Sequence, residues 1–140
     1  MRISARCDYA CRAILELVKH WPKKEPLHTD IISDKQNIPI RYLVHILIEL
    51  KKMGIVSSIR GKDGGYVLAK KPAEITLGEI VKEVSGPFVP IADTASNSTS
   101  AFSNVWSDVE QAIANVLNKV TFEDIEKNVK AYSSILNYQI

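Results

Sequence analysis

Two thiol side chains near the start of the sequence are its first candidates for chemistry. Cys7 and Cys11 are the only 2 cysteines among the 140 residues, and their spacing places both on one face of a helix. A zinc or redox site needs further ligands, and His20, His28 and His45 have no ligand spacing. The thiol pair also continues an apolar stripe, which favours buried structural cysteines. We therefore predict no metal site and no cofactor.

A second group of candidates is cationic and surrounds two adjacent glycines. Residues 60–71 read RGKDGGYVLAKK, so that a flexible turn lies beside the most concentrated positive charge of the chain. Arginine and lysine on a thin ribbon neutralise phosphates, and glycines let the backbone approach another surface closely. The alternative interpretation is a solvated hairpin whose lysines serve only solubility.

The charge of the chain is distributed unevenly, although its formal net charge is only +2. Residues 1–71 contain 14 Lys and Arg against 7 Asp and Glu, whereas residues 72–140 contain 4 against 9. The first part therefore suits a polyanion such as DNA, and the second part does not.

The spacing of apolar residues predicts the helices that position these groups. Ser4 is suited to cap a first amphipathic helix, in which both cysteines lie on the apolar stripe. A short second helix opens at His28 or Thr29. It ends near Asn37, which tolerates a left-handed turn better than most residues.

A longer third helix is predicted over residues 38–53, with Pro39 in its first turn and Gly54 as its stop. Leucines and isoleucines form its inward stripe. The opposite stripe carries Arg41, His45, Glu49 and Lys52. Two helices joined by a tight turn, the second with a basic polar face, are the outline of a helix-turn-helix.

Two short β-type runs, IVSSIR and YVLAK, follow and predict a hairpin wing over residues 55–70 with Asp63-Gly64 as its turn. Thr76 and Glu79 then form a T-x-x-E capping box at the start of a fourth helix, which Gly86 ends. The predicted fold class is mainly α with a small β-hairpin wing.

The remaining residues predict a loop and two further helices. Residues 88–104 are rich in Ser, Thr, Ala and Asn and are expected to form a mobile loop. Helical spacing resumes over residues 105–119, and Thr121 is suited to cap a last helix. We expect three parts: a winged helix-turn-helix over 1–87, the loop over 88–104 and a helical dimerisation region over 105–140.

No pattern of an enzyme or of a membrane protein accompanies these elements. The sequence has no nucleophile elbow, phosphate loop or paired catalytic carboxylates, so no catalytic residue is expected. It also lacks an apolar run of about 20 residues, and its first residues are charged where a signal peptide is apolar. A cytoplasmic, non-enzymatic protein is the expectation.

Three stretches of the sequence together resemble a known family. These are ISARCDYACRA, IPIRYLVHILIELKKMGIVSSIRGKDGGYVLAKKPAEITLGEIVKEVSGP and VTFEDI, and they are similar to the Rrf-two family of bacterial winged-helix transcription regulators. The resemblance covers residues 1–87 well and the later helices loosely. It implies a homodimer that binds a palindromic DNA operator, with a long C-terminal helix at the dimer interface.

Many members of that family hold an iron–sulfur cluster on three cysteines between the fourth and fifth helices. The corresponding residues 88–104 contain no cysteine here, and Ser and Thr hydroxyls are poor substitutes for thiolates. The cluster therefore does not carry over to this chain. The leading hypothesis is a dimeric, sequence-specific DNA-binding repressor. The alternatives are an iron–sulfur or metal-dependent redox sensor of the same family and a winged-helix protein-interaction module without DNA binding, and the effector is not predicted.

These patterns select two sets of residues. The first set is expected to contact double-stranded DNA: Arg2, Arg6, Thr29, Arg41, Tyr42, His45, Lys52, Arg60, Gly61, Lys62, Gly64, Gly65 and Tyr66. The second set is expected to form the dimer interface: Trp106, Val109, Ile113, Val116, Leu117 and Val120. Alternatives remain for Arg41 as an ion-pair partner of Asp34, for His45 as a solvated residue, and for the fifth helix as packed on its own domain.

Overall fold

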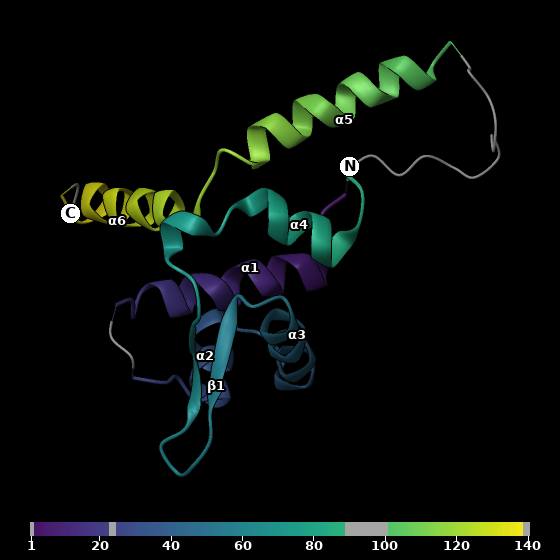
Figure 1. Cartoon of the computed structure of the whole chain (residues 1–140). Coiled ribbons are helices and arrows are strands. Elements are labelled where there is room, and N and C mark those ends of the chain that lie inside the picture. The colour runs from purple at the N-terminus through teal and green to yellow at the C-terminus, as the bar shows by residue number, and fades with distance from the viewer. Residues whose placement is uncertain (1, 23–24, 89–100, 139–140) are drawn as a thin grey trace.

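The computed structural model of the chain describes residues 2–22, 25–88 and 101–138. Within them the elements are α1 (Ala5–Val18), α2 (Thr29–Gln36), α3 (Ile40–Lys52), β1 (Val56–Ile59), β2 (Gly65–Leu68), η1 (Pro72–Glu74), α4 (Leu77–Ser85), α5 (Ser103–Leu117) and α6 (Phe122–Tyr138). Helix α1 crosses the centre, with α4 on one side and α2, α3 and the hairpin on the other (Figure 1). The predicted mainly α fold with a winged helix-turn-helix is confirmed.

Capping residues explain where the first two helices begin and end. The Ser4 hydroxyl accepts a hydrogen bond from the Cys7 backbone N–H at 3.1 Å, which starts α1 as predicted. The His28 ring accepts from the Asp30 N–H at 3.4 Å and starts α2. Asn37 ends α2 in the predicted left-handed conformation, with φ 52° and ψ 51°.

Helix α1 holds the turn between α2 and α3 through polar side chains. Arg12 donates to the Gln36 carbonyl at 2.6 Å, and the Gln36 amide donates to Glu16 at 2.8 Å. Glu16 is only 3% exposed, and Lys19 lies 3.3 Å from its carboxylate. The buried charge is therefore both paired and hydrogen-bonded, as burial of a carboxylate requires.

Helix α3 begins slightly later than predicted. Pro39 is the residue before the helix, with φ −56° and ψ 128°, and is not part of its first turn. The extended backbone at this point lets Ile38 enter the core, where it is 2% exposed. Ser33 of α2 also donates to the Ile38 carbonyl at 2.6 Å, which fixes the chain before α3 starts.

The loop of the hairpin is longer than predicted. Gly64 donates to the Gly61 carbonyl at 3.1 Å, so Lys62 and Asp63 form the corner of the turn. A two-residue Asp-Gly turn would need positive φ at Asp63. Among the described residues, positive φ occurs here at Gly61, 119°, and at Gly65, 151°, and not at Asp63.

A third extended segment joins the hairpin to the helices. Leu27 donates to the Tyr66 carbonyl at 2.9 Å, and Tyr66 donates back to the Leu27 carbonyl at 2.8 Å. Strand β2 therefore pairs with β1 on one side and with the segment before α2 on the other. This close approach requires a glycine at position 65, because a Cβ there would collide with the Leu27 carbonyl.

The capping box predicted at Thr76 is only half formed. Glu79 donates its backbone N–H to the Thr76 hydroxyl at 3.2 Å, but its carboxylate lies 3.5 Å from Lys70. The ion pair draws the carboxylate away from the Thr76 N–H. A complete reciprocal box occurs instead at α6, where Thr121 and Asp124 exchange hydrogen bonds of 3.1 and 3.2 Å.

The expected loop over residues 88–104 overlaps described residues at both of its ends. Phe88 is 5% exposed, and α5 already begins at Ser103. Residues 89–100 lie outside the described residues. The fifth helix therefore starts earlier than the predicted residue 105, since its first turn carries no strong helix signal in the sequence.

The chain returns to the first core after α5. Phe122 is 1% exposed and belongs to the main core with residues of α1 and α3. Its N–H donates to the Ile75 carbonyl at 3.0 Å, and the Leu77 N–H donates to the Val120 carbonyl at 2.8 Å. The start of α6 thus packs on the part of the chain that was expected to form a separate domain.

The close approach at position 65 yields a stability prediction. Gly65→Ala introduces both an unfavourable φ and a backbone collision, whereas Gly61→Ala introduces only the unfavourable φ, since no atom lies within 4 Å of its Cβ. We expect Gly65→Ala to lower the free energy of unfolding by about 1–3 kcal/mol more than Gly61→Ala. Urea unfolding followed by circular dichroism measures the difference, and equal destabilisation by the two substitutions would contradict the collision.

Candidate nucleic-acid interface

The outward face of α3 combines cations with apolar side chains. The inward stripe is fully buried and consists of Leu43, Ile46, Leu47 and Leu50. Arg41, His45 and Lys52 lie exposed on the opposite side, where the sequence places them. Val44 and Ile48 share that face and are each 43% exposed.

Val44 and Ile48 were not predicted as part of this face. Their position between Arg41 and Lys52 on a helical wheel is the signal that identifies them, because both fall opposite the buried stripe. The face of α3 is therefore not purely polar. It offers one guanidinium, one imidazole, one ammonium and two β-branched apolar groups.

Arg41 is held by an alternating row of aromatic and cationic side chains. Its guanidinium carbon lies 4.9 Å from the Tyr42 ring centroid, and one of its nitrogens lies 3.3 Å from the Tyr42 hydroxyl. The Tyr42 ring lies 6.2 Å from that of Tyr9, which Arg12 covers at 4.9 Å. Within the described residues no ion pair between Arg41 and Asp34 is found, so the guanidinium stays available at the surface.

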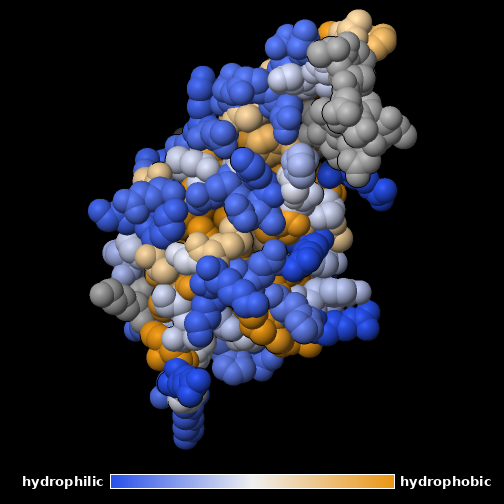
Figure 2. All heavy atoms as spheres, turned by 45° about the vertical axis from the view of Figure 1, so that its right-hand side comes forward, coloured by the Kyte–Doolittle hydropathy of each residue, from blue (hydrophilic) through white to orange (hydrophobic). Residues whose placement is uncertain are grey.

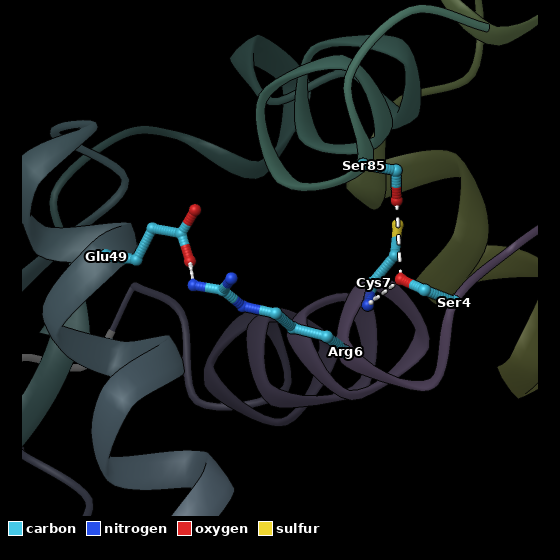
Figure 3. Close-up of polar contacts among 5 residues, drawn as sticks. All are labelled: Ser4, Arg6, Cys7, Glu49 and Ser85. Atoms are coloured by element: carbon cyan, nitrogen blue, oxygen red, sulfur yellow. Dashed lines mark hydrogen bonds and ion pairs between the residues drawn. The ribbon is translucent and has the colours of Figure 1, made fainter. Parts of the chain in front are cut away.

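A groove separates the start of α1 from α3. Its volume is about 590 Å³, and its lining consists of Ala5, Arg6, Tyr9, Tyr42, His45 and Ile46. Arg6 reaches across it and pairs with Glu49 of α3 (Figure 3). Three of the predicted DNA-contacting residues, Arg6, Tyr42 and His45, thus come together beside one groove.

The wing carries unpaired positive charge. Arg60 and Lys62 are exposed, and in the described part of the chain neither has a carboxylate within 4.0 Å. Figure 2 shows that the projecting tip at the bottom of the molecule is hydrophilic. Lys70 differs, since its pairing with Glu79 turns it toward α4 and away from the tip.

The other predicted DNA-contacting residues fall into two groups. Arg2 and Gly61 are exposed, and Thr29 is half-buried at the start of α2. Gly64 is buried in the hairpin, and Gly65 and Tyr66 are half-buried where the hairpin pairs with residue 27. A Cβ at position 64 would collide with the Ile59 carbonyl, so both of these glycines are needed by the hairpin itself.

The thiol pair lies behind this surface, on the opposite side of α1. Cys7 is fully buried and Cys11 is half-buried. The hydrogen bond donated by the Cys11 thiol lowers the pKa of Cys7 to about 6, and the Ser85 hydroxyl acts in the same direction. That shared proton and burial raise the pKa of Cys11.

The predicted dimer-interface residues of α5 divide into two groups. Ile113 and Leu117 pack on a small core formed with Val81 and Phe88 of the same chain. Val120 is half-buried beyond the end of α5. The rest of the set stays solvent-exposed, at 46% for Trp106, 39% for Val109 and 64% for Val116.

Comparison with known proteins gives this arrangement a family. Residues 3–128 match the sequence profile of Rrf2, described as an iron-dependent transcriptional regulator. The chain belongs to the Rrf2 (Rrf-two) family. The predicted family, and the prediction of a DNA-binding transcription regulator that is not an enzyme, are thereby confirmed.

Individual members of the Rrf2 family align along most of the chain. An rrf2-like HTH-type transcriptional regulator of Rhodobacter capsulatus is 30% identical over 136 residues, covering 88% of this chain and 91% of its own. The solved structure of CymR (YrzC), titled the global cysteine regulator of B. subtilis, superposes with a TM-score of 0.79 at 30% identity, covering 91% and 98%. T. potens IscR superposes with a TM-score of 0.78 at 29% identity, covering 92% and 88%.

The iron named in the family description does not fit the donors of this Rrf2 chain. Its only 2 cysteines both lie in α1. The described residues contain no group of three or more His, Cys, Asp and Glu side chains able to hold a metal ion. These donors therefore give iron no binding site among the described residues. No described helix is long and apolar enough to span a bilayer.

Proposed function

We propose that the protein is a cytoplasmic homodimeric repressor that binds a palindromic operator in double-stranded DNA. The observation that carries the proposal is the placement of Arg41 and Lys52 on α3 and of Arg60 and Lys62 on the wing, for none of which the described residues provide a carboxylate partner. Both elements lie on the side of α1 opposite α4 (Figure 1). Cations on one side of a molecule allow several phosphates to be neutralised at once.

Helix α3 is the proposed recognition helix in the major groove. Arg41 is near its start, where a guanidinium can donate to O6 and N7 of guanine in bidentate fashion. Its stacking on Tyr42 restricts the guanidinium before DNA binds, which lowers the entropy cost of binding. Val44 and Ile48 are suited to contact the methyl groups of thymine.

The wing and the start of α1 are proposed to contact the DNA backbone on either side of α3. Arg60 and Lys62 at the hairpin tip meet phosphates or enter the minor groove. Arg2 supplies positive charge at the opposite edge, and Arg6 is proposed to exchange its ion pair with Glu49 of α3 for a phosphate. These contacts fix the orientation of the recognition helix and carry little sequence information.

The proposed dimer forms through the first half of α5, whose apolar side chains are not covered by the core of their own chain. Figure 1 shows this end of α5 extending beyond α4. Val105, Trp106 and Val109 are 50, 46 and 39% exposed, and an apolar face of this kind indicates a protein contact. A protein-interaction module without DNA binding is less favoured, because it would not need a polyanion-binding surface. The exposed cations on α3 and the wing, which have no carboxylate partner among the described residues, form such a surface.

Charge removal tests the DNA interface. Arg60→Ala and Lys62→Ala should weaken binding to all duplexes and reduce the salt slope by about 1 for each phosphate that is no longer neutralised, while Arg41→Ala should also relax base preference. Lys127→Ala, on α6 and paired with Glu123, is the matched control and should change neither. Fluorescence anisotropy at several salt concentrations is the measurement. Unchanged affinity and preference for Arg41→Ala would remove α3 from the recognition role.

Replacing thymine by uracil tests the apolar contacts of α3. In an operator selected from a random duplex library, each contacted thymine changed to uracil should weaken binding about 3–4-fold, since a buried methyl contributes roughly 0.8 kcal/mol. The Val44→Ala, Ile48→Ala double variant should be insensitive to this change, and Ile135→Ala on α6 should remain sensitive. Equal sensitivity of the double variant and the wild type would argue against these contacts.

Charge placed on the exposed part of α5 tests the dimer. Trp106→Glu combined with Val109→Glu should give a folded monomer with much weaker operator binding, because a dimer reads two half-sites about one helical turn apart. Light scattering at micromolar concentration measures the mass, and circular dichroism checks folding. Ile113→Glu is the comparison variant, because Ile113 packs on Val81 of its own chain. It should therefore lower the stability of the fold, which Trp106→Glu with Val109→Glu should not. A wild-type chain that is monomeric in solution would refute the dimer.

A further inference from the structure

We propose that the groove between α1 and α3 binds a small aromatic carboxylate, and that this ligand is an effector that releases the protein from DNA. The volume of the groove, about 590 Å³, lies within the usual range of small-molecule sites. The release of DNA rests on the function proposed above, whereas the binding of the ligand does not.

The lining of the groove is mainly apolar and aromatic. Ile46 is 2% exposed and belongs to the main core. Ala5 and the rings of Tyr9 and Tyr42 complete the apolar part of the lining. A DNA backbone that runs across α1 and α3 presents phosphates and sugars, which gain little from such a surface. The lining instead fits the apolar, ring-shaped part of a small molecule.

The two tyrosine rings determine how an aromatic ligand lies. Their centroids are 6.2 Å apart, and their planes are inclined by 32°. A third ring between them would need about 7 Å, twice the optimal separation of carbon atoms. Arg12 and Arg41 each lie 4.9 Å from one of the rings and cover one of its faces. The ligand ring therefore lies across the sides that both tyrosines turn toward the groove, in an offset or edge-to-face arrangement.

The charged groups beside the groove favour an anion. Arg6 reaches from α1 to Glu49 of α3 (Figure 3). Arg12 pairs with Asp8 at 3.0 Å, whereas Arg41 has no carboxylate partner among the described residues. These three guanidinium groups and two carboxylates leave one positive charge unmatched. A neutral or cationic aromatic ligand would not use that charge.

The carboxylate of the ligand has its donor in Arg6. The side chains of Arg6 and Glu49 are 56% and 29% exposed, so water screens their ion pair and its exchange costs little. A ligand carboxylate can replace that of Glu49 and accept two parallel hydrogen bonds from the guanidinium. His45 is part of the same lining, and its imidazole N–H is a further donor. The groove thus matches both parts of an aromatic acid.

The aromatic acid and DNA use the same side chains. Arg6, Tyr42 and His45 line the groove and also belong to the residues proposed to contact DNA. A guanidinium that is bound to a ligand carboxylate is not available to a phosphate. A ligand ring on Tyr42 also disturbs the stacking that restricts Arg41. Ligand and DNA therefore compete, and the acid acts as the inducer of a repressor.

Calorimetric titration of the full chain without DNA tests the site. Benzoate, cinnamate and indoleacetate are the probes, and at least one of them should bind saturably with one equivalent per chain. The uncharged alcohol with the same ring system should bind about ten-fold more weakly or worse, because it cannot form the charged hydrogen bonds with Arg6. Lack of saturable binding by all three acids, or equal affinity for acid and alcohol, would overturn the site.

Substitutions of the ion pair should change the affinity for the acid in opposite directions. Arg6→Gln removes the donor and should weaken binding about ten-fold, whereas Glu49→Gln removes the competing carboxylate and should strengthen it about two- to five-fold. Arg60→Gln on the wing is the control and should leave acid binding unchanged. Weaker binding by both variants of the pair would mean that the pair only shapes the groove, and would contradict the exchange.

Anisotropy with operator DNA tests the competition. The acid at ten times its dissociation constant should weaken operator binding by the wild type about ten-fold or more, and Arg6→Gln should show a smaller decrease. Acid binding with unchanged DNA affinity would refute the effector role. A ligand-free chain that binds no DNA would refute the proposed function instead, because acid binding is measured without DNA.

Light scattering distinguishes the acid from a second copy of the chain as the occupant of the groove. The mass in solution should be the same with and without saturating acid. A lower mass in the presence of the acid would show that the acid displaces a second copy from the groove, and would overturn the assignment to a small molecule.

Discussion

The contact between α1 and Gln36 fixes the position of α3, and most features of the proposed DNA-binding surface depend on it. Arg12 and Glu16, one turn apart on α1, bind the carbonyl and the amide of Gln36. Hydrogen bonds that involve a charged group stabilise a fold by about 1.5–3 kcal/mol each, and breaking the one from Gln36 would leave the buried Glu16 carboxylate with only its ion pair to Lys19. The turn therefore has a single favourable position. Asn37 and Ile38 then set the direction in which α3 leaves it.

The same helix α1 organises the two faces of the molecule. Its polar and aromatic side chains, Arg6, Tyr9 and Arg12, contact α3 and the turn, whereas Cys7 and Cys11 face α4 and α5. Recognition elements and the proposed dimer helix thus never touch directly through a large surface. Helix α1 lies between them, since it packs against α3 on one side and shares the small core around Val81 with α5 on the other.

Local signals in the sequence were sufficient for the existence of the helices and for the buried and the cationic positions of α3. Ser4, Asn37 and Thr121 act on their immediate neighbours, so their capping and turn roles were readable from residue type and spacing. The long-range pairing of Leu27 with Tyr66 was not readable, and it explains why Gly65 is required where a flexible tip was expected. The burial of Phe122 in the main core was not readable either, because its residue type and spacing indicated only one apolar position of the last helix.

The candidate site followed the same division between local and long-range information. Exposure of Arg41 and His45 follows from helical spacing, but stacking of Arg41 on Tyr42 and the pairing of Arg6 with Glu49 depend on how α1 and α3 meet. Val44 and Ile48 were missed because an apolar residue is usually assigned to the core. Their exposure becomes evident only when the buried stripe is known.

Helix α5 is attached firmly at one end and exposed at the other, which makes it a lever. Hydrogen bonds at Val120 and Phe122 fix the chain just after the helix, whereas Phe102 before it is 65% exposed. A helix of 15 residues is about 22 Å long, so a tilt of roughly 10° at the fixed end moves the exposed end by about 4 Å. In a dimer joined through that exposed end, each small rotation on α4 is converted into a larger change in the distance between the two recognition helices.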